Sequence, residues 1–136
     1  MDAIILQMGG WSPVVHRRGA QLFYEMPVAS GHADRHFSFE IKARDLAVLE
    51  QDAERYWCLY AALHHPYQLK ETELGPAMRA KYFETILHGT PKQAEAFLTQ
   101  LDHGAAKGAI SNLVSICMKR DQAPMRAGQW LTNPHP

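Results

Sequence analysis

The chain has 136 residues, of which 46% are apolar and 21% are charged, and its 14 basic and 14 acidic side chains cancel. This composition is typical of a globular domain and excludes disorder over the whole chain. It argues against a nucleic-acid-binding protein, because such proteins usually carry a basic excess that neutralises phosphate. No stretch comes near the roughly 18 consecutive apolar residues of a membrane-spanning helix. The N-terminus lacks the basic segment of a secretory signal, so we expect no membrane partner and a cytoplasmic location.

The first third of the chain predicts strands. Residues 3–8 form a short apolar run that suits a buried strand. Residues 20–26 are rich in aromatic and apolar side chains, which favour a second strand. Residues 36–41 alternate between apolar and polar types, so their apolar side chains would face the core. Residues 27–35 (PVASGHADR) predict a long polar loop that joins these two strands into a hairpin.

The next segments predict two helices. A short helix is expected over residues 44–51. The second helix follows Asp52, whose carboxylate is placed to accept hydrogen bonds from the free N–H groups of the first turn. Four apolar side chains then recur at the spacing of one helical face: Tyr56, Leu59, Tyr60 and Leu63. Pro66 is expected to end this helix.

Three more helices are expected in the second half. One covers residues 76–88. The next begins at Thr90, which forms a capping box with Gln93, and Gly104 ends it. The last covers residues 106–119, where apolar side chains again recur at helical spacing.

Together these elements predict an α+β fold, in which a small N-terminal antiparallel sheet of two or three strands packs on four or five α-helices. We expect one domain over residues 1–136. Its strand-rich part is residues 1–42, its helical part is residues 43–120, and residues 121–136 form an irregular tail. Trp130 is expected to tie down part of that tail.

Eight histidines are an unusually high number for this length. His32, Asp34 and His36 lie two residues apart and would point to the same side of an extended segment. Two imidazoles and a carboxylate are accepted ligands of zinc and iron, so one hypothesis is a small metal-dependent enzyme or metal-binding domain. The simpler interpretation is a polar hairpin tip with solvated histidines, because no fourth ligand is evident. We therefore assign no metal, and the sequence contains no cofactor-binding motif.

No arrangement typical of a catalytic site is found. Cys58 is interpreted as a packing residue and Cys117 as part of the core, because nothing marks either thiol as activated. His64 and His65 lie at the end of a helix, where protonated histidine is favourable for the helix dipole. The patterns of phosphate-binding loops and nucleophile elbows are absent. We therefore expect no enzymatic activity and no catalytic residue.

A charged surface is the better-supported kind of site. Glu50, Asp52 and Glu54 cluster where two helices meet, and the polar loop over residues 28–36 projects between strands. Together they predict a face that would steer a basic partner toward the protein. The alternative is an ordinary solvated helix start, in which Asp52 acts only as a cap.

The stretch FSFEIKARDLAVLEQDAERYWCLYAALHHPYQL resembles the central segment of small bacterial immunity proteins. These partner the toxin domains of contact-dependent growth inhibition and related polymorphic toxin systems. The matching positions, about a quarter of the chain with the residues between them, are Phe37, Phe39, Ile41, Asp45, Leu46, Val48, Leu49, Asp52, Arg55, Leu59, Leu63 and His64. The resemblance implies a cytoplasmic protein without activity of its own. Such a protein would bind one cognate toxin C-terminal domain and block its active site or its substrate-binding surface.

We therefore expect a non-enzymatic, antitoxin-like immunity protein, with the metal-dependent enzyme or metal-binding domain as the alternative. The expected partner-binding residues combine the loop with the acidic cluster: His32, Asp34, His36, Glu50, Asp52 and Glu54. If the toxin is a nuclease, the acidic side chains would take the place of phosphates.

Overall fold

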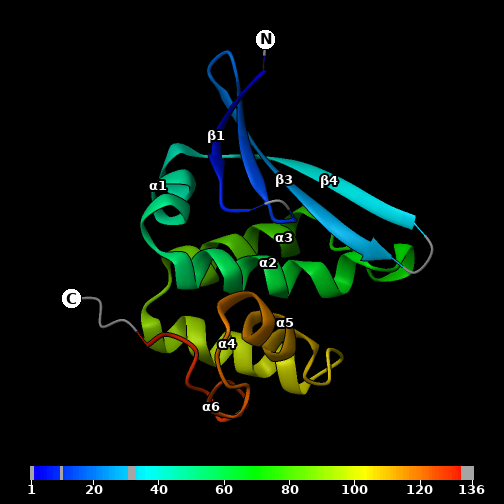
Figure 1. The fold of residues 1–136 in the computed structure, drawn as a ribbon, viewed down its shortest axis with the longest axis vertical. Coiled ribbons are helices and arrows are strands. Elements are labelled where there is room, and N and C mark those ends of the chain that lie inside the picture. Colours follow the sequence, from blue (N-terminus) through cyan, green and yellow to red (C-terminus); the bar gives the residue numbers. More distant parts are fainter. Residues whose placement is uncertain (1, 10, 31–32, 133–136) are drawn as a thin grey trace.

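A computed structural model describes residues 2–9, 11–30 and 33–132. It is an α+β fold, in which a four-stranded antiparallel sheet of order β1-β2-β3-β4 comes first and the helices follow. The helices lie on one side of the sheet, with α2 and α3 nearest to it and α4, α5 and α6 farther away (Figure 1). The predicted fold class is confirmed, and the predicted strand number is too low.

The strands are β1 (Asp2–Gln7), β2 (Val14–Arg18), β3 (Gln21–Ser30) and β4 (Ala33–Ile41). Sequence analysis missed β2, in which Val15 alone is fully buried. Its strand conformation comes from hydrogen bonding to a neighbour on each side, which the apolar pattern does not encode.

The long loop predicted over residues 27–35 is wrong, because β3 continues to Ser30 and β4 begins at Ala33. Pro27 lies inside β3, and the strand tolerates it for a geometric reason. β2 pairs only with residues 21–25 of β3, so the later half of β3 has a strand partner on one side alone. Pro27 turns its carbonyl toward the other side, where a missing N–H breaks no ladder hydrogen bond.

Helix α2 (Ala53–Tyr67) covers that half of β3. Tyr60 donates a hydrogen bond of 2.8 Å to the Pro27 carbonyl. One turn later, His64 Nε2 accepts a hydrogen bond of 3.3 Å from the Ala29 N–H, and Gln68 donates one of 3.1 Å to the Ala29 carbonyl. Side chains spaced four residues apart on one helix therefore bond the backbone edge of β3, which protects that edge from pairing with another chain.

The other helices are α1 (Ala43–Gln51), a 3-10 turn η1 (Lys70–Thr72), α3 (Pro76–Phe83), a π-helical turn η2 (Glu84–His88), α4 (Pro91–His103), α5 (Ala109–Met118) and α6 (Ala123–Arg126). The predicted helices over 44–51 and 76–88 and the one that begins at Thr90 are confirmed within a residue or two. The helix predicted over 106–119 is shorter at its start, and α2 runs one residue past Pro66.

The predicted helix caps are present. Asp52 accepts a hydrogen bond of 3.1 Å from the Arg55 N–H. Thr90 and Gln93 form the reciprocal capping box, with hydrogen bonds of 3.1 and 3.0 Å. These local signals fix where α2 and α4 begin.

The core is built around α2. Eleven of its fifteen residues are buried, so it is covered on nearly all sides rather than on one face. The sheet covers one side with Val15, Tyr24, Met26 and Val28, all fully buried, and α5 lies against another. Within the described ranges, no helix is long and apolar enough to cross a membrane.

The C-terminal part is more ordered than predicted. The helix α6 lies within the segment expected to be irregular. Trp130 is fully buried, which confirms that it ties down the tail.

Candidate functional site

The sheet turns one of its faces away from the helices (Figure 1). The even-numbered residues of β3 from Leu22 to Val28 are buried, so its odd-numbered residues point to the opposite side. The strand register carries this alternation to the neighbouring strands. We call the resulting surface the outer sheet face, and it contains Ile4, Val14, His16, Arg18, Phe23, Glu25, Asp34, His36, Ser38 and Glu40.

Three large exposed apolar side chains belong to β1 and to the connection that follows it. Ile4 is 56% exposed, and Met8 and Trp11 in the connection to β2 are 43% and 49% exposed. The Trp11 ring contacts the His36 ring edge-on, with 6.5 Å between their centroids. Trp11 therefore extends the outer sheet face toward β4. Half-exposed tryptophan beside a polar surface is typical of the anchors of protein–protein interfaces.

The outer sheet face also carries more negative than positive charge. Asp34 and Glu40 are exposed on β4. Glu25 lies on the adjacent strand, with its carboxylate 3.5 Å from His16 Nε2. Arg18 supplies a guanidinium at the end of β2. Three carboxylates around exposed apolar groups suit a basic partner.

Two of the predicted partner-binding residues lie on this face. Asp34 and His36 are exposed and project from β4 on the same side. Both belong to β4, which begins before the predicted strand over residues 36–41 and so includes Asp34, a residue of the predicted loop. The strand holds both side chains in fixed positions. His32 lies outside the described residues.

The predicted acidic face at the start of α2 is wrong. Asp52 is 8% exposed, and besides capping the helix it lies 3.3 Å from Arg55 Nε. Arg55 in turn donates hydrogen bonds to the carbonyls of Ile86 and Gly89. Asp52 therefore belongs to a buried link between α2 and η2. Of the three predicted carboxylates, Glu50 alone is exposed, on α1, so the three do not form a common acidic surface.

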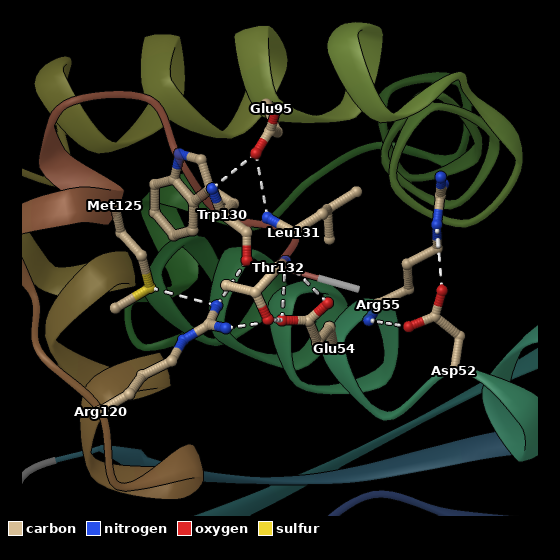
Figure 2. Close-up of polar contacts among 9 residues, drawn as sticks. All are labelled: Asp52, Glu54, Arg55, Glu95, Arg120, Met125, Trp130, Leu131 and Thr132. Atoms are coloured by element: carbon tan, nitrogen blue, oxygen red, sulfur yellow. Dashed lines mark hydrogen bonds and ion pairs between the residues drawn. The ribbon is translucent and has the colours of Figure 1, made fainter. Parts of the chain in front are cut away.

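Glu54 is even less accessible, at 2% exposed. Its Oε2 accepts a hydrogen bond of 2.7 Å from Arg120, and the Thr132 N–H donates to the same carboxylate at 3.0 Å (Figure 2). The charge that sequence analysis assigned to the surface is therefore neutralised inside the protein. The reason is tertiary, because the C-terminal segment returns over the first turn of α2.

A second carboxylate holds the same segment. Glu95 on α4 accepts hydrogen bonds from the N–H groups of Trp130 at 2.7 Å and Leu131 at 3.0 Å (Figure 2). The indole of Trp130 donates to Thr99 at 2.9 Å, and Arg120 donates to the Trp130 carbonyl at 2.6 Å. Glu54, Glu95, Thr99 and Arg120 all form hydrogen bonds to residues 130–132. We therefore interpret these side chains as fixing the C-terminal segment rather than as a binding site.

One histidine–carboxylate pair was not foreseen. His88 Nε2 lies 2.6 Å from Asp45 Oδ1, and both side chains are mostly buried. The other oxygen of Asp45 accepts a hydrogen bond from the Lys42 N–H. Among the described residues no hydroxyl or thiol is hydrogen-bonded to His88, so the pair lacks the nucleophile of a catalytic triad. The two partners are 43 positions apart in the sequence, so no local pattern indicates the pair.

The other titratable candidates have structural explanations. Burial raises the pKa of the Cys58 thiol to about 12, which agrees with its interpretation as a packing residue. Cys117 was predicted to lie in the core, but it is only partly buried. Burial, with a smaller effect of His65, lowers the pKa of His64, and its ring accepts a hydrogen bond. A protonated, helix-capping role for His64 is therefore wrong.

The metal hypothesis gains no support from geometry. Over the described parts of the chain, no three His, Cys, Asp or Glu side chains come together in a way that could hold a metal ion. Asp34 and His36 share a face, but His32 lies outside these parts. The hypothesis therefore rests on the sequence alone.

Comparison with known proteins adds no relative. No protein-family model matches the chain, and neither a curated protein nor a solved structure is significantly similar to it.

Proposed function

We propose that the chain is a non-enzymatic immunity protein that binds a cognate bacterial toxin domain in the cytoplasm and neutralises it. The observation that carries this proposal is the outer sheet face, where half-exposed Trp11 contacts His36 on the same strand that exposes Asp34 and Glu40. Isolated exposed apolar side chains are common, but three large ones, Ile4, Met8 and Trp11, fall within β1 and its connection to β2. A grouped apolar surface with a charged surround is a feature of binding sites for proteins.

The two kinds of side chain have different tasks in such a complex. The carboxylates of Asp34 and Glu40 attract a basic toxin surface and accelerate association. Trp11 then enters a pocket of the partner and slows dissociation. Strand β4 holds Asp34 and Glu40 in place before binding, and the ring contact with His36 positions Trp11, so little conformational entropy is lost.

The toxin would be inhibited because the bound protein covers its functional surface. A stable complex of this kind buries about 1,200–2,000 Å² in total, enough to cover the active site or the substrate-binding surface of a small toxin domain. A nuclease toxin would present cationic groups that normally meet phosphate, and the carboxylates of the outer sheet face would occupy them.

Co-expression tests the function directly. The untagged chain is produced with the tagged toxin C-terminal domain encoded immediately upstream of its gene, and the complex is isolated through the tag. We expect a one-to-one complex and survival of the host. A toxic domain that is neither bound nor neutralised by this chain would contradict the proposal.

Variants then test the face. Trp11→Ala is expected to raise the dissociation rate at least tenfold. Asp34→Lys combined with Glu40→Lys is expected to lower the association rate and its dependence on salt. Glu71→Lys is the matched control, because Glu71 is exposed on η1, away from the outer sheet face. Unchanged kinetics in both face variants would exclude this surface.

Charge reversal at Asp52 or Glu54 is not a suitable test. Both carboxylates are buried and paired with arginine, so reversal would place two like charges together in the interior. Lost binding in such a variant would report unfolding rather than a missing contact.

A further inference from the structure

A groove lies where β4 passes into α1. One wall is the corner of residues 39–45, and the other is the stretch of α3 and η2 from Pro76 to Glu84. Its volume is about 510 Å³, within the range of roughly 300–1,000 Å³ that is typical of sites for small molecules. The groove shares Glu40 with the outer sheet face but none of its large exposed apolar residues Ile4, Met8 and Trp11, so it neighbours the proposed toxin-binding surface without including Trp11.

The inner part of the groove is apolar. Phe39, Ile41 and Phe83 line it, and the last two are each only 7% exposed. Phe39 is held from behind by the ring of Tyr67, with 5.4 Å between centroids. Because the Arg79 guanidinium lies over the same ring, a flat apolar body in the inner part of the groove meets Ile41 and Phe83 rather than a free face of Phe39.

The rim is cationic. Lys42, Arg44 and Arg79 all line the groove, and the Arg79 guanidinium lies 4.3 Å from the centre of the Phe39 ring. Lys81 lines it too, although its ammonium group lies near Phe97. These side chains come from both walls, so a ligand between them meets positive charge on two sides.

The carboxylates of the groove offset only part of this charge. Asp45 is paired with His88, and Glu84 is paired with Arg44 at 2.5 Å. Glu40 also lines the groove, and its side chain is exposed on β4. No ion pair joins Lys42 or Arg79 to a carboxylate among the residues that the structure describes.

We propose that this groove binds a small organic anion, in which a carboxylate or phosphate group is carried on an aromatic body. The aromatic part lies against Ile41 and Phe83, beside the Arg79 guanidinium that covers Phe39. The anionic group meets Arg79, whose planar guanidinium suits a carboxylate or phosphate through two parallel hydrogen bonds, and Lys42 on the opposite wall. The exposed Arg44–Glu84 pair lies at the mouth.

Calorimetric titration with 2-naphthoate tests the site, and neutral 2-naphthamide is the matched control for its charge. We expect saturable one-to-one binding of 2-naphthoate, and at least tenfold weaker binding of 2-naphthamide. Backbone amide NMR shifts are expected to change over residues 39–45 and 76–84. Equal affinity for both compounds, or shifts centred elsewhere, would overturn the proposal.

Variants locate the charge. Arg79→Gln combined with Lys42→Gln is expected to weaken 2-naphthoate at least tenfold while the circular dichroism spectrum stays unchanged. Lys70→Gln combined with Lys92→Gln removes two exposed cations outside the groove and is expected to leave affinity unchanged. An unchanged affinity in the groove variant would refute the site.

Two further measurements separate the possible outcomes. Trp11→Ala is expected to bind 2-naphthoate normally, which keeps this test independent of toxin binding. If neither 2-naphthoate nor 2-naphthyl phosphate binds but an oligoglutamate peptide does, the occupant is an acidic macromolecule and the small-ligand proposal is wrong.

Discussion

Glu54 and Arg120 form a buried ion pair in which Oε2 and Nη1 lie 2.7 Å apart, although 66 residues separate them in sequence. The Glu54 side chain is 3% exposed and that of Arg120 is 20% exposed. Arg120 also donates to the Trp130 carbonyl, so the pair joins the first turn of α2 to the C-terminal segment. Arg120 therefore links the first turn of α2 to Trp130 near the C-terminus.

Removing the cation should therefore destabilise the whole protein. Arg120→Met leaves the Glu54 carboxylate buried without its charged partner, and breaking such a pair costs about 3–5 kcal/mol. We expect a loss of about 3 kcal/mol in the free energy of unfolding, because Thr132 still donates to Glu54. Urea denaturation followed by tryptophan fluorescence measures it.

The exposed pair between Arg44 and Glu84 is the matched control. Its side chains are 50% and 57% exposed, so solvent already screens the interaction. Arg44→Met is expected to leave the urea denaturation midpoint nearly unchanged, because exposed ion pairs contribute little. Equal losses in the two variants would show that burial does not decide the strength of these pairs.

Glu95 is expected to control local order in the tail. Glu95→Gln replaces the charged acceptor of the Trp130 and Leu131 N–H groups with a neutral one, and charge-assisted hydrogen bonds are the stronger kind. We expect hydrogen exchange of these two amides to speed up at least tenfold while exchange within α2 stays slow. Uniform acceleration would mean that the tail and the core unfold together.

Structural features could be predicted from the sequence where the residues that determine them lie close together along the chain. The caps at Asp52 and Thr90 were predicted because their partners lie three residues away. Pro27 was taken for a loop residue because the sequence does not show that α2, rather than a strand, covers its side of β3.

The candidate site was predicted in part for the same reason. Asp34 and His36 were identified as exposed polar groups, and they are exposed. Glu54 was also assigned to the surface, but its burial depends on Arg120 and Thr132, which lie far along the chain. Trp11 was not singled out, since a lone tryptophan after Gly9 and Gly10 has no pattern that distinguishes an exposed ring from a buried one.

Tyr24 should tolerate the loss of its hydroxyl. The side chain is fully buried against Phe83, and its hydroxyl has no hydrogen-bond partner among the described residues. Because an unpaired buried polar group is costly, Tyr24→Phe is expected to stabilise the protein by about 1 kcal/mol. Tyr60→Phe, which removes the hydrogen bond to Pro27, is expected to cost about 1 kcal/mol. Thermal denaturation of the two variants checks the opposite signs, and destabilisation by Tyr24→Phe would contradict the first.

The two thiols should differ in reactivity. Burial raises the pKa of Cys58 to about 12, and the residue is fully buried. Burial also raises the pKa of Cys117, but this residue is partly exposed. With iodoacetamide at about pH 8, we expect slow labelling of Cys117 and none of Cys58 until urea unfolds the protein. Peptide mass spectrometry locates the label, and early modification of Cys58 would show that α2 opens in the native state.

The contact between His64 and β3 should make stability depend on pH. Burial lowers the pKa of His64 below its ordinary value of 6.5, and the neutral ring accepts the hydrogen bond from the Ala29 N–H. Below about pH 6.5 the unfolded chain takes up this proton more readily than the folded one. The stabilisation from neutral His64 is therefore complete above that pH and declines as the pH falls toward the folded-state pKa.

We expect the melting temperature to fall between pH 7.5 and 5.5, and to fall less in His64→Gln, which keeps an acceptor but does not titrate. His103→Gln is the matched control, because His103 is exposed at the end of α4 and the glutamine amide can replace its ring as donor to the Arg126 carbonyl. Its melting temperature should follow that of the unmodified protein. Hydrogen exchange of the Ala29 amide should accelerate over the same pH range, after correction for intrinsic rates, and the acceleration should be absent in His64→Gln. A pH dependence that is identical in all three proteins would place the responsible proton elsewhere.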